Sequence, residues 1–245
     1  MTLTIQRYQN GQTRTETFDI ASLRVTTLLG AFYEIKAKLD PTLTFDAGCR
    51  SGVCGRCAVR VNGRETLACS HTLQGNEHIE PLRYHPIQRD LKVDKFQAQA
   101  KIISVDARGE AIPTHNAPNP EEESRYRLQT DCILCDSCYS ACPVLAVNPD
   151  FLGPFALTRA WRYATDSRYD TEGESSNTSL LEAVQTNGIW DCTLCGECTA
   201  VCPQHIDPKS DILHLRTASL HAGYSDPTFA QQSFGVPDFG GNSFT

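Results

Sequence analysis

The sequence has no long run of apolar residues and no excess of basic charge. No stretch approaches the roughly 20 apolar residues of a membrane-spanning helix, so any link to a membrane is expected to run through another subunit. The first residues, MTLTIQRYQNGQTRTET, lack an apolar core of signal-peptide length. The formal net charge is -7, which excludes the basic surface required by nucleic acid or an anionic lipid surface. We therefore expect no nucleic-acid partner and no transmembrane segment on this chain.

Without an export signal, the cysteines are expected to lie in the cytoplasm, where thiols stay reduced. The 245 residues contain 12 cysteines, a smaller share than the 8–10% or so that marks short disulfide-rich secreted chains. Structural zinc is the closer alternative, but zinc sites usually consist of CxxC pairs separated by a longer loop. Densely spaced thiols favour iron-sulfur clusters instead.

The twelve cysteines divide into three groups of four, and each group has the spacing of an iron-sulfur ligand set. The first group reads C-x4-C-x2-C with a distant fourth thiol, the plant-type [2Fe-2S] spacing, and contains Cys49, Cys54, Cys57 and Cys69. The other groups each read C-x2-C-x2-C-x3-C-P, the run of bacterial two-cluster ferredoxins. They contain Cys132, Cys135, Cys138 and Cys142, and Cys192, Cys195, Cys198 and Cys202. The chain is predicted to hold three clusters and to move electrons.

In paired runs of this kind, the fourth cysteine of each run ligates the other cluster. Cys202 is then expected to complete a [4Fe-4S] set with Cys132, Cys135 and Cys138. Cys142 is expected to cross to a third cluster with Cys192 and Cys198. The proline after each fourth cysteine fixes φ and turns the chain away from the cluster.

Residues 1–95 are predicted to form a small β-rich domain. The segments TLTIQRY and TRTETFDI are strand-like and flank a turn signal at Asn10-Gly11. A helix should follow, with one apolar face and an end before Pro41; the face contains Leu28, Leu29, Phe32, Ile35 and Leu39. The segment AVRVNGRETLAC predicts a second hairpin, turning at Asn62-Gly63 and carrying Cys69 on its return strand. Gly48, Gly52 and Gly55 should let the backbone wrap closely and direct N–H groups at cluster sulfurs.

Residues 96–225 are predicted to be helical, with a linker at 107–123 rich in Pro and acidic residues. PFALTRAWRYA predicts a helix with Pro154 near its start and an apolar stripe of Leu157, Ala160, Trp161 and Ala164. SLLEAVQTNG predicts a short helix capped by Ser179 and stopped by Gly188. Asp207-Pro208 should open a last helix that ends at Gly223. Residues 226–245 are predicted to form an extended tail.

The order of these parts resembles the iron-sulfur subunit of succinate dehydrogenase and fumarate reductase. Beyond the cysteines, five motifs carry the resemblance: Gln88-Arg89-Asp90-Leu91, NPDFLGP at 148–154, Asp166-Ser167-Arg168, Asn187-Gly188-Ile189-Trp190 and His205-Ile206-Asp207-Pro208. The resemblance implies an α+β fold, with an N-terminal plant-type ferredoxin-like β-grasp domain and a C-terminal all-helical bacterial-ferredoxin-like domain.

The same resemblance implies a [2Fe-2S] cluster near a FAD-bearing catalytic subunit, a middle [4Fe-4S] cluster and a third cluster near a membrane quinone. The carbon chemistry would belong to FAD on the partner, so no catalytic residue is expected on this chain. The chain would lie on the cytoplasmic side of the cytoplasmic membrane as a peripheral subunit, beside a membrane-anchor or other acceptor subunit.

Two features depart from the family pattern. Most members carry another residue at the position of Cys195 and hold a [3Fe-4S] cluster with the thiols matching Cys142, Cys192 and Cys198. The extra thiol predicts a third cluster of the [4Fe-4S] type, with Cys195 as its fourth ligand. The alternative is a [3Fe-4S] cluster with Cys195 as a bystander thiol. Many succinate dehydrogenases have a quinone-site Trp after the second cysteine group and a His after the first thiol of the third, where this chain has Ala146, Val147 and Thr193. Gln204 replaces a Lys that is common after the last Cys-Pro pair, which removes a cation close to a cluster. No quinone residue is assigned.

Two other functions stay open. The acceptor could be a thiol- or disulfide-linked or peripheral subunit with the same flavoprotein partner, which Cys195 and the missing aromatic residues favour. The chain could also be a freestanding multi-cluster ferredoxin. A free carrier has no need for the helical segments outside the cysteine runs, which argues against that function.

Overall fold

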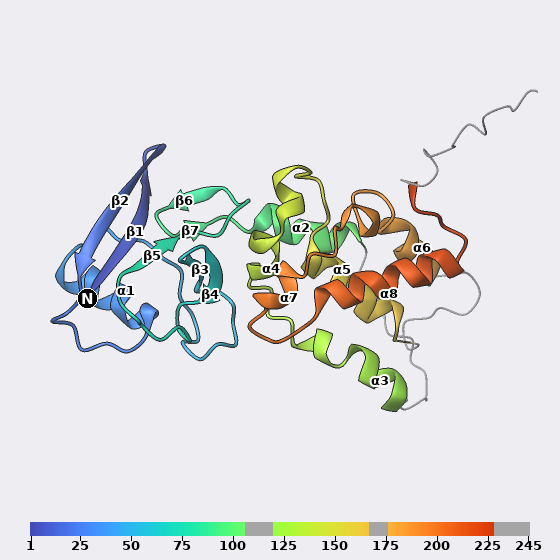
Figure 1. Cartoon of the computed structure of the whole chain (residues 1–245), viewed down its shortest axis with the longest axis horizontal. Helices are drawn as coiled ribbons and strands as arrows, with labels where there is room; N and C mark the ends of the chain where they lie inside the picture. The colour runs from blue at the N-terminus through green and yellow to red at the C-terminus, as the bar shows by residue number, and fades with distance from the viewer. Residues whose placement is uncertain (106–119, 167–175, 228–245) are drawn as a thin grey trace, which may run out of the picture.

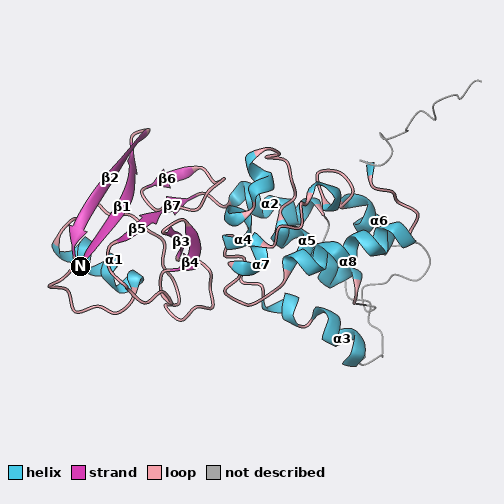
Figure 2. Ribbon diagram, viewed as in Figure 1, coloured by secondary structure: helices cyan, strands magenta, loops and turns pink. Residues whose placement is uncertain are grey.

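The computed structural model describes residues 1–105, 120–166 and 176–227. Strands occupy the N-terminal part and helices dominate the C-terminal part, and the two parts lie end to end along the long axis of the molecule (Figure 1). Figure 2 shows the same division by secondary structure. The predicted α+β class, a sheet domain followed by a helical region, is confirmed. The expected linker at 107–119 and tail from residue 228 lie outside the described residues, as do Ser167 and Arg168.

A mixed five-stranded sheet of order β2-β1-β5-β3-β4 forms the N-terminal part. Its strands are β1 (Thr2–Gln9), β2 (Gln12–Asp19), β3 (Ala58–Val61), β4 (Arg64–Leu67) and β5 (Glu77–Glu80), and β6 (Ile87–Arg89) and β7 (Lys92–Val93) form a separate ribbon. The pairs β1–β2 and β3–β4 are antiparallel hairpins, whereas β5 runs parallel to β1. Both hairpins turn at the predicted Asn-Gly pairs, where all four residues have positive φ, as a type I′ turn requires.

The helix α1 (Leu28–Lys38) packs its apolar face into the core under this sheet. The Thr27 side chain caps it by accepting a hydrogen bond from the Gly30 N–H. Leu28, Leu29, Phe32 and Ile35 are buried as predicted. Leu39 is 49% exposed, so its place on the apolar face was wrong, because the helix ends at Lys38 and Leu39 falls outside its periodicity.

Cys69 does not lie on the return strand of the second hairpin, as predicted, but in the turn after it. Strand β4 ends at Leu67, and the N–H groups of Ser70 and His71 both donate to the Leu67 carbonyl. These bonds curl the chain out of the sheet ladder immediately around Cys69. The curl, and not a strand, sets the direction of this thiol.

The helical part is built around two long helices, α5 (Pro154–Ala164) and α8 (Pro208–His221), which pack against each other. Around them lie α2 (Phe96–Ser104), α3 (Pro120–Tyr126), α4 (Ser137–Ala141), α6 (Ser176–Ala183) and α7 (Glu197–Ala200), with short 3-10 turns at η1 (Leu128–Asp131), η2 (Pro143–Ala146) and η4 (Ile189–Asp191). Leu157 and Ala160 of α5 and Ile212 and Leu215 of α8 are fully buried in the second core. This core supports both cysteine runs.

The predicted helix boundaries hold for α5 and α8. Pro154 begins α5. It fits there because an N–H at the first helical position has no acceptor within the helix, so its absence costs no hydrogen bond. Asp207 caps α8 by accepting from the Ser210 N–H, and Pro208 takes the first helical position. Gly223, with φ of 91°, follows the end of α8 as a left-handed stop.

Three boundaries were predicted wrongly. The last residues of the expected linker begin α3, whose first turn holds Glu121, Glu122 and Glu123, because carboxylates at a helix start interact favourably with its dipole. Helix α6 begins at Ser176, so Ser179 lies inside it instead of capping it. The same helix ends at Ala183, well before Gly188.

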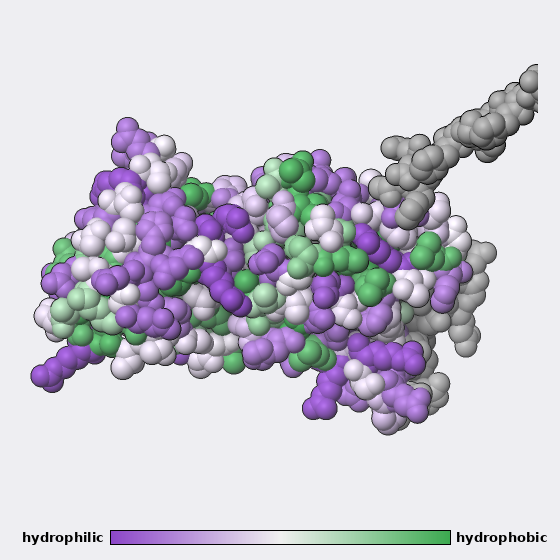
Figure 3. All heavy atoms as spheres, in the orientation of Figure 1, coloured by the Kyte–Doolittle hydropathy of each residue, from purple (hydrophilic) through white to green (hydrophobic). Residues whose placement is uncertain are grey.

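The surface carries only small, separate apolar patches on the face shown in Figure 3. Val147 and Phe96 are the most exposed large apolar side chains of the described residues, at 84% and 76%. Among residues 1–105, 120–166 and 176–227, none of the helices has the length and apolar character needed to cross a membrane.

Candidate metal centres

The first thiol set lies on a tightly wound loop that runs from Gly48 to Cys57. Gly52 and Gly55 adopt left-handed backbone conformations, with φ of 78° and 68°. The Cys49 N–H points at the Cys54 sulfur and the Ser51 N–H at the Cys49 sulfur, both at 3.4 Å. The loop therefore aims backbone donors at thiol sulfurs, the arrangement that stabilises a bound anionic cluster.

The environment of this set changes from its exposed rim to its buried end. Hydrogen bonds from Ser51 lower the pKa of Cys49 to about 6. Burial raises the pKa of Cys57 to about 12, because a lone thiolate is poorly solvated there. The iron of a bound cluster would supply the positive charge that a buried thiolate needs, so the donor set fits such a group.

The two later cysteine runs share one backbone path, as their repeated spacing suggests. Each begins on a 3-10 turn whose C-terminal cap is the first cysteine, Cys132 after η1 and Cys192 after η4. Left-handed residues recur at matching positions, Leu134 with Leu194 and Asp136 with Gly196. A short helix then follows in each run, α4 and α7, and these two helices pack together. The repeat places the two thiol sets side by side.

The second set surrounds a cavity. Cys132, Cys135, Cys138 and Cys202 line it together with apolar side chains that include Phe155 and Ile206. Burial raises the pKa of Cys132 to about 11 and that of Cys138 well above its ordinary value. In the described part of the chain, no three His, Cys, Asp or Glu side chains are close enough to hold a single metal ion. The four thiols, three from the first run and one from the second, instead line one common cavity.

The third set brings Cys142 from the first run to the cysteines of the second. Burial raises the pKa of Cys142, and the neighbouring charges of Cys192 and Cys195 raise it further. Burial likewise raises the pKa of Cys198 to about 12, with Cys192 and Cys142 adding to the effect. Cys195 is the exposed member, whereas Cys142 and Cys198 are buried. Cys195 is therefore close enough for its charge to act on two of these thiols, those of Cys142 and Cys192.

Arg216 of α8 fixes the loop that leads into the third set. Its guanidinium donates to three carbonyl oxygens: those of Ile189 at 2.8 Å, Trp190 at 3.2 Å and Cys192 at 2.6 Å. Burial raises the pKa of Cys192, and the Arg216 charge opposes that rise. The side chain therefore both holds the backbone of this loop and places a cation near its thiol.

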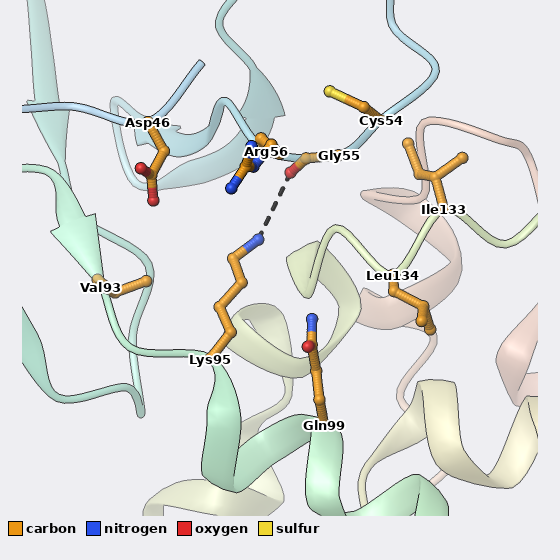
Figure 4. A pocket seen from close by; sticks show the side chains of 9 residues that line it. All are labelled: Asp46, Cys54, Gly55, Arg56, Val93, Lys95, Gln99, Ile133 and Leu134. Carbon is orange, nitrogen blue, oxygen red and sulfur yellow. Dashed lines mark hydrogen bonds between the residues drawn. The ribbon is translucent and has the colours of Figure 1, made fainter. Parts of the chain in front are cut away.

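The first and second sets meet at the junction between the sheet and the helical part. Lys95 Nζ donates to the Cys135 carbonyl at 2.8 Å and to the Gly55 carbonyl at 3.4 Å. Figure 4 shows Lys95 extending from the start of α2 toward Gly55, beside a cavity of about 300 Å³ that Cys54 and Leu134 also line. One side chain thus joins the loops of two thiol sets.

Other polar contacts fasten the same junction. Arg64 donates to the Ala200 carbonyl at 2.7 Å, and the Gln204 side chain donates to the Gly52 carbonyl at 3.3 Å. The Ser140 hydroxyl donates to the buried Glu65 carboxylate at 2.7 Å. The cysteine runs are therefore docked directly on the sheet domain.

Sequence reasoning missed Lys95 and Arg216. Lys95 does carry a local signal, because it takes the N-cap position of α2, where Ser, Thr, Asp and Asn are preferred and a cation faces the positive end of the helix. Arg216 carries none, because an Arg on a partly exposed helix is commonplace. The contacts of both residues depend on tertiary structure.

Two protein-family models match the chain in succession. The first, described as a 2Fe-2S iron-sulfur cluster binding domain, covers residues 2–100. The second, described as a 4Fe-4S dicluster domain, covers residues 129–206. The order of the two models follows the order of the thiol sets.

Similar proteins extend over most of the chain. The fumarate reductase iron-sulfur subunit of Haemophilus influenzae is 39% identical over 215 residues, which is 80% of this chain and 82% of that protein. The subunit of the same description from Mycobacterium tuberculosis is 37% identical over 218 residues, 84% and 87% of the two chains. A solved chain of the Mycobacterium smegmatis Sdh1 complex in the apo form has the same fold, with a TM-score of 0.75, 21% identity and coverage of 91% and 97%.

Proposed function

The chain belongs to the iron-sulfur subunits of the fumarate reductase and succinate dehydrogenase family, and we propose that it relays electrons between a FAD-containing catalytic subunit and a membrane quinone site. One observation supports this function most strongly. The three thiol sets follow one another through contacts between the segments that carry them: Gly55 lies against Cys135, and helix α4 packs against helix α7. Such a row offers a continuous path from the sheet domain into the helical part.

The proposed ligands are Cys49, Cys54, Cys57 and Cys69 for [2Fe-2S], and Cys132, Cys135, Cys138 and Cys202 for [4Fe-4S]. When bound, such clusters take up and release single electrons at potentials set by charge, hydrogen bonds and burial. The chain contributes the rest: thiols at fixed positions, N–H donors aimed at Cys49 and Cys54, and apolar walls such as Phe155 that keep water from the second set.

For the third centre we propose a [4Fe-4S] cluster with Cys142, Cys192, Cys195 and Cys198 as ligands. The charge of Cys195 acts directly on Cys142 and Cys192, which supports its membership of the set. A [3Fe-4S] cluster with Cys195 as a bystander is the alternative. A fully thiol-ligated third cluster also favours the second candidate acceptor, a thiol- or disulfide-linked or peripheral subunit in place of quinone.

We further propose that residues 1–95 form a plant-type ferredoxin-like β-grasp domain and residues 96–225 an α-helical ferredoxin domain, with a tail at 226–245. Strand β7 ends at Val93 and helix α2 begins at Phe96, which supports that boundary. The chain would lie peripherally on the cytoplasmic side of the membrane, held there by a membrane-anchor subunit.

The test is substrate reduction of the purified complex. The chain is co-expressed with a FAD-containing catalytic subunit of the family, and visible absorbance is followed anaerobically after succinate is added. We expect the iron-sulfur absorbance to bleach with succinate and to recover with fumarate or a soluble quinone. Bleaching by dithionite with no response to succinate would contradict the proposed partner. Co-purification of a membrane-anchor subunit would distinguish the quinone acceptor from the peripheral one.

A further inference from the structure

Lys95 is the side chain through which the first and second thiol sets are joined. Its ammonium donates to the carbonyl of Cys135, a proposed ligand, and to that of Gly55, which lies between two other proposed ligands. The shorter bond, 2.8 Å against 3.4 Å, goes to Cys135. The ammonium is therefore bound more closely to the second-set loop, at the backbone of a proposed ligand, than to the first-set loop.

The position of Lys95 is unfavourable for its own helix. It is the N-cap residue of α2 and makes no capping hydrogen bond with its side chain. A cation at this end of a helix faces the positive end of the helix dipole, which is unfavourable. Asp94 supplies the missing acceptor instead, because its carboxylate accepts from the Phe96 N–H at 2.9 Å. Local helix stability thus gives no reason for a lysine here, whereas the two carbonyls across the domain junction do.

A fixed cation beside an iron-sulfur cluster acts on its reduction. A cluster that gains an electron becomes more negative, so a nearby positive charge stabilises the reduced form and raises the potential. Lys95 is half-buried at the edge of the cavity in Figure 4, where its charge is less screened than on the open surface. Arg56 and Asp46, which also line this cavity, carry opposite charges.

We propose that Lys95 is a positioning residue for electron transfer. Its side chain holds the first-set loop against the second-set loop, and its charge raises the reduction potential of the second cluster more than that of the first. With both clusters bound, this charge would favour transfer of one electron from the first centre to the second, with no bond made or broken and no proton transferred. This inference rests on the ligand sets of the proposed function. It assigns to one side chain both the spacing between two clusters and part of their difference in potential.

Three substitutions separate the two roles. Lys95→Arg keeps the charge and the donors, Lys95→Gln keeps a donor without the charge, and Lys95→Met removes both. Lys38→Gln is the matched control, because it removes the same charge from α1, where Lys38 is 60% exposed and pairs with Glu34. Each protein is purified as the complex with its flavoprotein. EPR-monitored redox titration then gives the potential of each cluster, and spin coupling between the two reduced clusters reports their separation.

We expect Lys95→Gln to lower the potential of the second cluster so that its reduced-to-oxidised ratio at a fixed potential falls at least threefold, with a smaller change at the first cluster. Lys95→Arg and Lys38→Gln should match the unmodified protein, and Lys95→Met should also weaken the spin coupling. Unchanged potentials in Lys95→Gln, or an equal shift in Lys38→Gln, would overturn the inference. Absence of clusters from the unmodified complex would overturn the proposed function itself, a different result.

Discussion

A methyl group placed on Gly55 would lie 2.8 Å from both the Cα and the Cβ of Cys135. The Ile133 carbonyl oxygen would be equally close, so the contact is with backbone and not with a side chain that could rotate away. Gly55 also has a φ of 68°, which L-residues other than glycine rarely adopt. The loops of the first and second thiol sets are therefore in direct backbone contact, and glycine at this position is what permits it.

Gly55→Ala is expected to separate the two loops. The added methyl group must displace the Cys135 backbone, on top of about 1–2 kcal/mol for the left-handed conformation. We predict incomplete loading of the second cluster and slower electron transfer from the first, measured by iron content and by stopped-flow reduction of the complex. Gly11→Ala is the control, because Gly11 has a φ of 78° but nothing within 4 Å of the added group. If both variants retain full clusters and equal rates, the contact has no role in the relay.

Cys195→Ala is expected to convert the third cluster from [4Fe-4S] to [3Fe-4S]. Cys142, Cys192 and Cys198 would keep three irons, so the iron content should fall by about one atom per chain. A [3Fe-4S] EPR signal should appear in the air-oxidised variant and be absent from the unmodified complex. Cluster spectra that are the same with and without the substitution would make Cys195 a bystander thiol.

Arg216→Gln is expected to loosen the loop from Ile189 to Cys192. The variant loses a charged group that donates to three carbonyls, for which we predict a loss of about 2–4 kcal/mol in the free energy of unfolding. Arg216→Lys should recover only part of this, because an ammonium lacks the planar fork of donors. Thermal unfolding and third-cluster content measure the effect. Arg125→Gln on the exposed face of α3 is the control, and an equal loss there would contradict the assignment.

Asp211→Asn is expected to stabilise the protein as the pH rises. Burial raises the pKa of Asp211 to about 6, although Gln129 donates a hydrogen bond to its carboxylate at 2.7 Å. Because the folded-state pKa lies above the unfolded one, ionisation is resisted in the folded state. Stability is therefore full below about pH 4 and falls as the pH rises through about 6.

The asparagine variant keeps the bond from Gln129 but cannot ionise. We predict that the free energy of unfolding of the variant equals or falls below that of the unmodified protein near pH 5. By pH 8 it should have gained about 2 kcal/mol relative to the unmodified protein. Thermal unfolding across this range measures the difference. Asp19→Asn, at an exposed carboxylate, should show no such trend. A difference between Asp211→Asn and the unmodified protein that is independent of pH would contradict this account.

Local sequence signals predicted the elements whose causes are local. The Asn10-Gly11 and Asn62-Gly63 turns fix their hairpins because asparagine and glycine accept positive φ. Asp207 caps α8 through a bond only three residues away. The spacing of the cysteines likewise indicated three thiol sets, and the structure places Cys202 at the cavity of the second set.

Tertiary structure decided the rest. Strand β5 is only four residues long and was not predicted, because it is held by parallel pairing with β1 at the centre of the sheet. Helix α2 lies in the part predicted to be helical, but no local pattern singled it out, and the Lys95 contacts depend on its position against the cysteine loops. Leu39 and Cys69 were placed wrongly for a related reason, since each element ended one or two residues earlier than its pattern suggested.

EPR spectroscopy of the purified complex, first oxidised in air and then reduced, tests the central claim most directly. The account predicts no [3Fe-4S] signal in the oxidised protein, followed on reduction by one [2Fe-2S] and two [4Fe-4S] centres with mutual spin coupling. A [3Fe-4S] signal would contradict the role given to Cys195 alone. The absence of any cluster signal in both states would contradict the electron-relay account as a whole.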